Sequence, residues 1–86
     1  MTRAELSTAI TKLTQSWEDR ARLFLKAEIK RANITYEELA TRLKSHGVTE
    51  NAASIANKLA RGTFAAAFFL ACLAALELDG IRLDDI

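Results

Sequence analysis

The chain has 86 residues, half of them hydrophobic, which is enough for one domain with a single core and too few for two domains. Its net charge of +1 is low for a protein held to nucleic acid by charge alone, and its single cysteine excludes an internal disulfide. Because proline is absent and helix-forming residues dominate, the composition predicts an all-α protein, a four- to five-helix bundle.

The N-terminal region predicts two helices. Residues 1–15 are expected to form a helical extension, because their apolar residues recur at helical spacing. A second helix is expected after Ser16, whose hydroxyl can accept from a free amide, and it ends at Asn33, which tolerates the left-handed conformation. We expect Trp17 in the core or in an interface, and not as a platform for base stacking. The inner face of this helix is a stripe of apolar residues: Trp17, Ala21, Phe24, Leu25, Ile29 and Ala32.

The middle of the chain predicts two shorter helices. Residues 35–38, "TYEE", form a capping box, in which the hydroxyl and the last glutamate each bind the other residue's amide. This helix ends at Gly47, which permits positive φ. Thr49 can cap the next helix, 49–60, which ends before Gly62. Its inner face consists of Ala52, Ile55, Ala56 and Leu59.

The last helix, predicted over 63–78, has no polar side between Phe64 and Leu76. Something must therefore cover both of its faces. Two arrangements are compatible with this pattern. Either the other helices wrap this helix on all sides, or one of its faces is an interface with a second copy of the chain or with another protein. The residues left for the N-terminal helix or for a second chain are Phe69, Leu70, Leu73 and Leu76. Residues 81–86 form an acidic C-terminal tail, either extended or as a turn packed on the core.

Other function classes find little support in the sequence. The apolar run is too short to span a bilayer and no signal peptide precedes it, so we expect a cytoplasmic protein without a membrane partner. Cys72 fits a reducing compartment as a small buried hydrophobe, and His46, the lone histidine, has no second metal ligand beside it. No catalytic triad spacing or glycine-rich phosphate loop is present, so we expect neither an enzyme nor a cofactor.

Charge is distributed unevenly along the chain. Up to Gly62 there are 11 Lys and Arg against 7 Asp and Glu, a net charge of +4, whereas Arg82 alone faces four acidic residues beyond it, a net charge of −3. This asymmetry can orient the molecule on a polyanion, although ordinary solvated surfaces show similar imbalances.

Helix 49–60 also shows a polar stripe. Its members are expected to face away from the apolar underside, in a position to read base edges in a major groove, with Asn57 at the edge. The alternative is a solvated helix face. The stripe consists of Asn51, Ser54, Lys58 and Arg61. Further candidates for phosphate contacts are Thr35, Lys30, Arg31, Arg42 and Lys44.

Three short motifs resemble the Cro and C1 repressor-like family: "ITYEELA" at 34–40, "GVT" at 47–49 and "LARG" at 59–62. The resemblance implies a helix-turn-helix core within residues 16–80 and a DNA-binding transcription regulator. A homodimer formed through the apolar last helix would also suit a palindromic DNA site. Ala40 and Gly47 are seven residues apart, against about four in that pattern, so residues 44–46 look like one inserted helical turn. This turn either lengthens the first helix of the pair or moves the second out of groove-fitting geometry.

Two further stretches, "EIKRANITYEELA" and "RGTFAAAFF", make the whole chain similar to an uncharacterised family of short bacterial proteins, which implies no activity.

The polar stripe and the repressor-like motifs together predict a small DNA-binding regulator that reads duplex DNA with helix 49–60. The alternative is a protein-interaction or dimerisation module on the same scaffold, without DNA binding.

Overall fold

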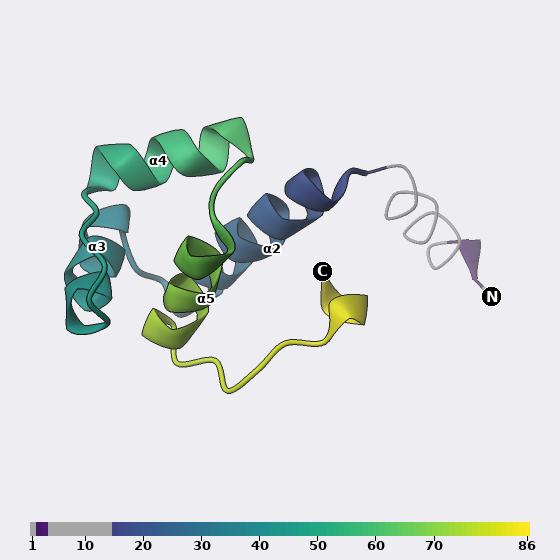
Figure 1. The fold of residues 1–86 in the computed structure, drawn as a ribbon. Coiled ribbons are helices and arrows are strands. Elements are labelled where there is room, and N and C mark those ends of the chain that lie inside the picture. The colour runs from purple at the N-terminus through teal and green to yellow at the C-terminus, as the bar shows by residue number, and fades with distance from the viewer. Residues whose placement is uncertain (1, 4–14) are drawn as a thin grey trace.

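The structure, a computed structural model, describes residues 2–3 and 15–86, which contain four complete α-helices and a short 3-10 helix (Figure 1). No residue of this described part lies in a strand, so the predicted all-α class is confirmed. The helix predicted over 1–15 lies almost entirely outside the described residues. The elements are α2 (Trp17–Ala32), α3 (Tyr36–Ser45), α4 (Ala52–Arg61), α5 (Ala66–Ala75) and η1 (Leu83–Asp85).

Helix α2 begins and ends at the predicted residues. The Ser16 hydroxyl accepts a hydrogen bond from the Asp19 amide at 3.1 Å, which satisfies one of the free donors of the first turn. Asn33 ends the helix with φ 57°, in the left-handed region that asparagine tolerates.

Helix α3 also has the predicted ends. The Thr35 hydroxyl accepts from the Glu38 amide at 3.1 Å, and this is the bond of the expected capping box that the structure shows. Gly47, at φ 76°, turns the chain so that the Val48 amide donates to the Leu43 carbonyl at 3.0 Å. This bond closes the helix end and lets Val48 pack against the core.

Helix α4 begins two residues later than predicted, because Asn51 and not Thr49 caps it. The Asn51 side-chain oxygen accepts from the Ser54 amide at 2.7 Å, and the Ser54 hydroxyl accepts from the Asn51 amide at 2.9 Å. These two bonds form a complete capping box. Gly62 ends the helix at φ 73°, and a Cβ there would lie 2.9 Å from Cδ of Arg22.

Helix α5 is shorter than the predicted 63–78 at both ends. Ala65, not Thr63, is its cap and offers no side-chain hydrogen bond. At its other end Glu77, and not Gly80, adopts a positive φ of 63°. The Leu78 amide then donates to the Leu73 carbonyl at 3.0 Å, which ends the helix in the same way as α3.

The helices enclose one core to which all four contribute. Helix α4 lies across α3, and α5 packs on α3 and α2 (Figure 1). The apolar underside of α4 is buried through Ile55 and Leu59. The other core residues are Leu25, Ile29, Leu39, Ala40, Leu43, Phe68, Cys72, Leu73, Ala75 and Leu76.

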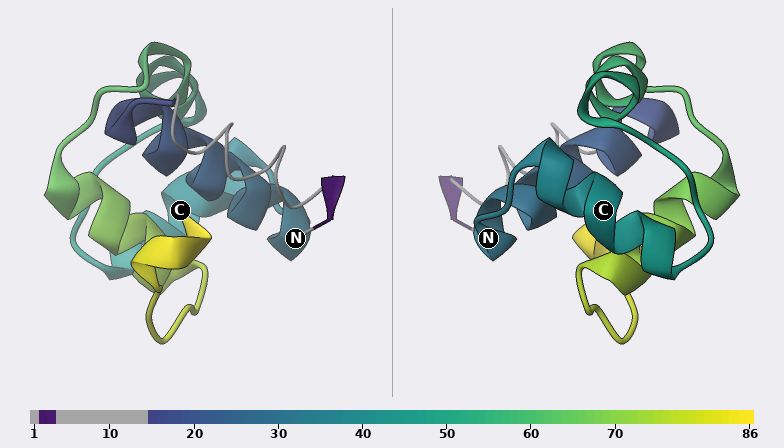
Figure 2. Two further views of the ribbon diagram at one scale, coloured as in Figure 1. Left: turned by 90° about the vertical axis from the view of Figure 1, so that its right-hand side faces the viewer. Right: turned by 90° about the vertical axis from the view of Figure 1, so that its left-hand side faces the viewer.

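The connection between α3 and α4 is longer than a helix-turn-helix turn. Residues 46–51 run beside α3 before α4 begins, as the views in Figures 1 and 2 show. The turn of that motif has three to four residues. The helix-turn-helix core expected from the family resemblance is therefore not confirmed.

The C-terminal residues return to α2. The Arg20 guanidinium donates two hydrogen bonds to the backbone oxygen of Ile86, at 3.0 Å from Nε and 2.7 Å from Nη2. The Ile86 side chain is buried. Of the two alternatives for residues 81–86, the structure shows the turn packed on the core, formed by η1.

Candidate functional site

Most of the polar stripe on α4 binds within the chain. Asn51 and Ser54 form the capping box, and the Ser54 hydroxyl also donates to Oε1 of Glu50 at 2.7 Å. Lys58 Nζ binds Oε2 of the same carboxylate and lies 4.8 Å from the centroid of the Phe68 ring. These three stripe residues, Asn51, Ser54 and Lys58, are therefore engaged by contacts within the chain, although Asn51 is exposed and the other two are half-buried. The sequence pattern showed which residues share a side of α4 but not that Glu50 lies beneath that side.

The Glu50 carboxylate is held in its charged form. Its side chain is only 9% exposed. This burial acts to raise its pKa, but the bonds from Lys58 and Ser54 outweigh it, so the pKa lies below its ordinary value of 4.5. The N-terminal side of α4 therefore contains a neutralised ion pair.

Of the predicted stripe, only Arg61 lies on the outward face of α4, where it is joined by residues outside the stripe. Ala53, Asn57, Ala60 and Arg61 are exposed. Within the described residues the Asn57 amide and the Arg61 guanidinium make no hydrogen bond or ion pair. No residue of α4 is acidic. This face can therefore offer amide and guanidinium donors to a ligand without first breaking an internal contact.

The other predicted phosphate contacts are distributed over several helices. Lys30 and Lys44 are exposed on α2 and α3. Arg31 pairs with the buried Glu28 at 2.5 Å, and Arg42 donates to the Ala75 carbonyl at 3.2 Å, where it binds the C-terminal end of α5. The Thr35 hydroxyl is used in the cap of α3.

The predicted dimer interface on α5 is largely inside the chain. Leu73 and Leu76 are core residues, so their assignment to an interface with a second chain is wrong. Phe69 packs against Phe24 and Phe64, with ring centroids 6.4 and 6.1 Å apart. Leu70 alone of the four predicted residues is fully accessible, at 63% exposed.

Comparison of the sequence with known protein families identifies the family of this chain. The profile of the domain of unknown function DUF6471 matches residues 17–81. The chain belongs to the DUF6471 family. Comparison with curated proteins and with solved structures finds no match. The DUF6471 match begins at the first residue of α2 and includes both α4 and α5. It fits the resemblance to an uncharacterised family of short proteins and gives no support to the Cro and C1 resemblance.

Trp17 is the first residue of the DUF6471 match and lies at the surface. It is 58% exposed, and the Arg20 guanidinium lies 4.0 Å from its ring centroid. Placement in the core is therefore wrong for Trp17, and its placement in an interface stays a prediction. Beside it lies a mostly apolar groove of about 370 Å³, bordered also by Ala21, Phe64, Ala66 and Phe69.

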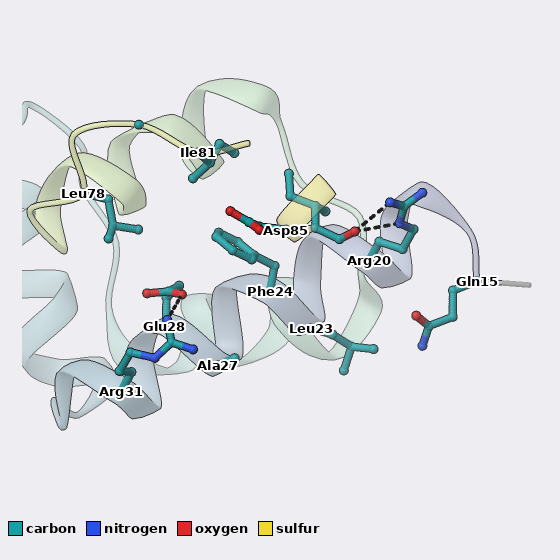
Figure 3. A pocket seen from close by; sticks show the side chains of 12 residues that line it. Gln15, Arg20, Leu23, Phe24, Ala27, Glu28, Arg31, Leu78, Ile81 and Asp85 are labelled. Atoms are coloured by element: carbon teal, nitrogen blue, oxygen red, sulfur yellow. Dashed lines mark hydrogen bonds and ion pairs between the residues drawn. The ribbon is translucent and has the colours of Figure 1, made fainter. Parts of the chain in front are cut away.

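A larger pocket of the DUF6471 domain, about 650 Å³, lies between α2 and the C-terminal residues (Figure 3). Phe24 from α2 and Leu78 and Ile81 from the chain after α5 form its apolar part. The Glu28–Arg31 pair and the Arg20 bonds to Ile86 line its polar parts. Each of these charged groups is already bound within the chain.

Cys72 lies in the core, as expected for a small hydrophobe. Burial, with a smaller effect from Glu50, raises the pKa of its thiol to about 12, which disfavours the thiolate form needed for metal binding or nucleophilic attack. Across residues 2–3 and 15–86 no cluster of potential metal ligands occurs. The helices in this part of the domain are also too short or too polar to cross a bilayer.

Proposed function

We propose that this DUF6471 domain binds duplex DNA with the outward face of α4, as a small regulator of transcription. The observation that supports the proposal is the pair of exposed donors, Asn57 and Arg61, with no partner among the described residues. They lie on one face of a helix whose other exposed residues are alanines, Ala53 and Ala60.

The chemistry of this face suits a major groove. Alanine side chains let a helix backbone approach base edges closely, and their methyl groups can contact the thymine methyl. An asparagine amide can pair twice with adenine, and an arginine can bind guanine or a phosphate. Asn57 would thus read a base, while Arg61, at the last residue of α4, would fix the helix against the backbone or read a neighbouring base.

The internal ion pair favours the same face. A free carboxylate beside α4 would repel phosphates, and Glu50 comes two residues before the helix begins. Because Lys58 and Ser54 bind that carboxylate, its charge is balanced within the chain. The bonds from Ser54 and Lys58 therefore remove an obstacle to a polyanion at this end of α4.

A DNA titration tests the proposal. A fluorescently labelled random-sequence duplex is titrated with the wild type, Asn57→Ala and Arg61→Ala at several salt concentrations from about 50 mM. We expect the wild type to bind with a strong salt dependence, and Arg61→Ala to lower the slope of log K against log salt by about 0.9 if it removes one phosphate contact. Asn57→Ala should weaken preference among sequences more than it weakens binding overall.

The matched control is Arg82→Ala, since Arg82 is an exposed arginine of the C-terminal segment, away from α4. It should bind DNA like the wild type. Absence of binding near 50 mM salt, or equal effects of the Arg61 and Arg82 variants, would rule out the α4 face. The alternative function, a protein-interaction module, is favoured by an exposed apolar face on α5.

A further inference from the structure

The outer face of α5 is apolar and is not covered by any described residue. Leu70 is exposed, and so are Ala66, Ala67 and Ala74, each of which lies three or four residues from it. A surface helix ordinarily has polar side chains on the side that faces water. Helix α5 has none, because every residue from Ala66 to Ala75 is apolar or the buried Cys72. This face therefore has the composition of an interface.

We infer that a second copy of this chain covers the face, with the two α5 helices packed antiparallel about a two-fold axis that passes beside Leu70. The inference is independent of DNA binding and uses a different helix. It also differs from the interface predicted from the sequence, of which only Leu70 is fully exposed.

The register of such a pair follows from the spacing of the exposed residues. Leu70 lies midway between Ala66 and Ala74, so a two-fold axis at Leu70 places each Ala66 opposite the partner's Ala74. Alanines at these positions allow the helix axes to approach closely, and the two Leu70 side chains fill the centre. Since the face carries no charge, pairing it with itself brings no like charges together.

The two ends of α5 are complementary to each other. The N-terminal end has no side-chain cap and no acidic residue in its first turn, so its free amides carry uncompensated positive partial charge. After the C-terminal end comes Glu77, which is exposed and whose carboxylate has no partner among the described residues.

Antiparallel pairing brings these ends together. Ala65 precedes Leu70 by five residues and Ala75 follows it by five, about 7.5 Å along the axis in each direction, and Glu77 comes two residues after Ala75. Each Glu77 would thus lie beside the uncapped N-terminus of the partner's α5, where a carboxylate is stabilised. This complementarity favours a second copy over an unrelated apolar helix, and an antiparallel pair over a parallel one.

The size of the face sets the strength of association. A single helix of ten residues is a small surface compared with the roughly 800 Å² per partner that stable complexes bury. We therefore expect weak, reversible dimers that form only at micromolar concentration or above.

Sedimentation velocity over about 10 µM to 1 mM protein tests the inference, a range that covers weak association. The wild type should move from monomer to dimer as its concentration rises. Leu70→Glu should remain monomeric, because it places two carboxylates together at the axis. Leu83→Glu, which changes another leucine of similar exposure outside α5, should dimerise like the wild type.

A second variant, Glu77→Gln, tests the register. It should weaken dimerisation several-fold without abolishing it, and added salt should reduce the difference from the wild type. Circular dichroism checks that each variant keeps its helices. A wild type that stays monomeric at the highest concentration, or one whose self-association survives Leu70→Glu, would overturn the inference. Dimerisation that needs Leu70 but ignores Glu77→Gln would overturn the antiparallel register.

Discussion

Glu50 is a carboxylate that the chain itself neutralises, through Lys58 and Ser54. Because these bonds hold its pKa below the ordinary value of 4.5, the unfolded chain binds more protons than the folded one at mildly acidic pH. The contribution of this group to stability is therefore fully present above about pH 5 and is lost as the pH falls through the folded-state pKa.

Glu50→Gln should remove this pH dependence. We expect the free energy of unfolding, from urea titrations between about pH 6 and pH 3, to fall more steeply for the wild type than for the variant. Glu37→Gln changes an exposed carboxylate without a partner among the described residues, and serves as the control. Parallel curves for the wild type and Glu50→Gln would show that the ion pair does not contribute to stability.

At the scale of helices, all four described helices from α2 to α5 end at a residue with left-handed φ, which is Asn33 in α2. Gly47 and Gly62 end α3 and α4, whereas Glu77, at φ 63°, ends α5. A side chain with a Cβ is strained in this conformation by about 1 kcal/mol or more, and glycine is not. We expect Glu77→Gly to raise the free energy of unfolding by about 1 kcal/mol, and Glu77→Ala to leave it nearly unchanged. Urea unfolding at low protein concentration, where the chain is monomeric, measures both; destabilisation by Glu77→Gly would contradict this account.

The helix ends also show how far sequence reasoning reaches. Local patterns predicted the caps at Ser16 and Thr35 and the left-handed ends at Asn33 and Gly47. Each of these features depends on residues within one helical turn of each other. The end of α5 has the same kind of bond as α3, from the Leu78 amide to the Leu73 carbonyl, but its left-handed residue is Glu77. Glutamate gives no local signal for positive φ, so the sequence pattern pointed to Gly80 instead.

The candidate site was harder to predict for a related reason. Helical spacing identifies the residues that share a side of α4, but it does not show which residues outside the helix contact that side. Asn51 in place of Thr49 as the cap keeps the preceding residues outside the helix, and the Glu50 side chain can then reach Ser54 and Lys58. Three of the four stripe residues are held by contacts within the chain, whereas Arg61 and Asn57, which the spacing placed at the edge, lie on the exposed face.

At the scale of the whole molecule, Arg20 joins the first described helix to residues 66 positions later in the chain. Its guanidinium binds the Ile86 backbone oxygen twice and also lies against the Trp17 ring. It therefore holds the C-terminal segment over the pocket that Phe24 and Ile81 line. A hydrogen bond from a charged donor contributes about 1.5–3 kcal/mol when buried, and less at this partly exposed position.

Arg20→Met keeps much of the side chain's apolar length but removes the donors, so we expect a loss of about 1 kcal/mol in the free energy of unfolding. Amide hydrogen exchange should accelerate at Asp85 and Ile86, whose amides close η1, and stay unchanged in α3 and α4. The emission of Trp17, the single tryptophan, should change because its cation neighbour is gone. Lys30→Ala, at an exposed position of the same helix, should alter none of these. If exchange at Asp85 and Ile86 is equal in the wild type and Arg20→Met, then the buried Ile86 side chain, and not Arg20, holds the C-terminal segment on α2.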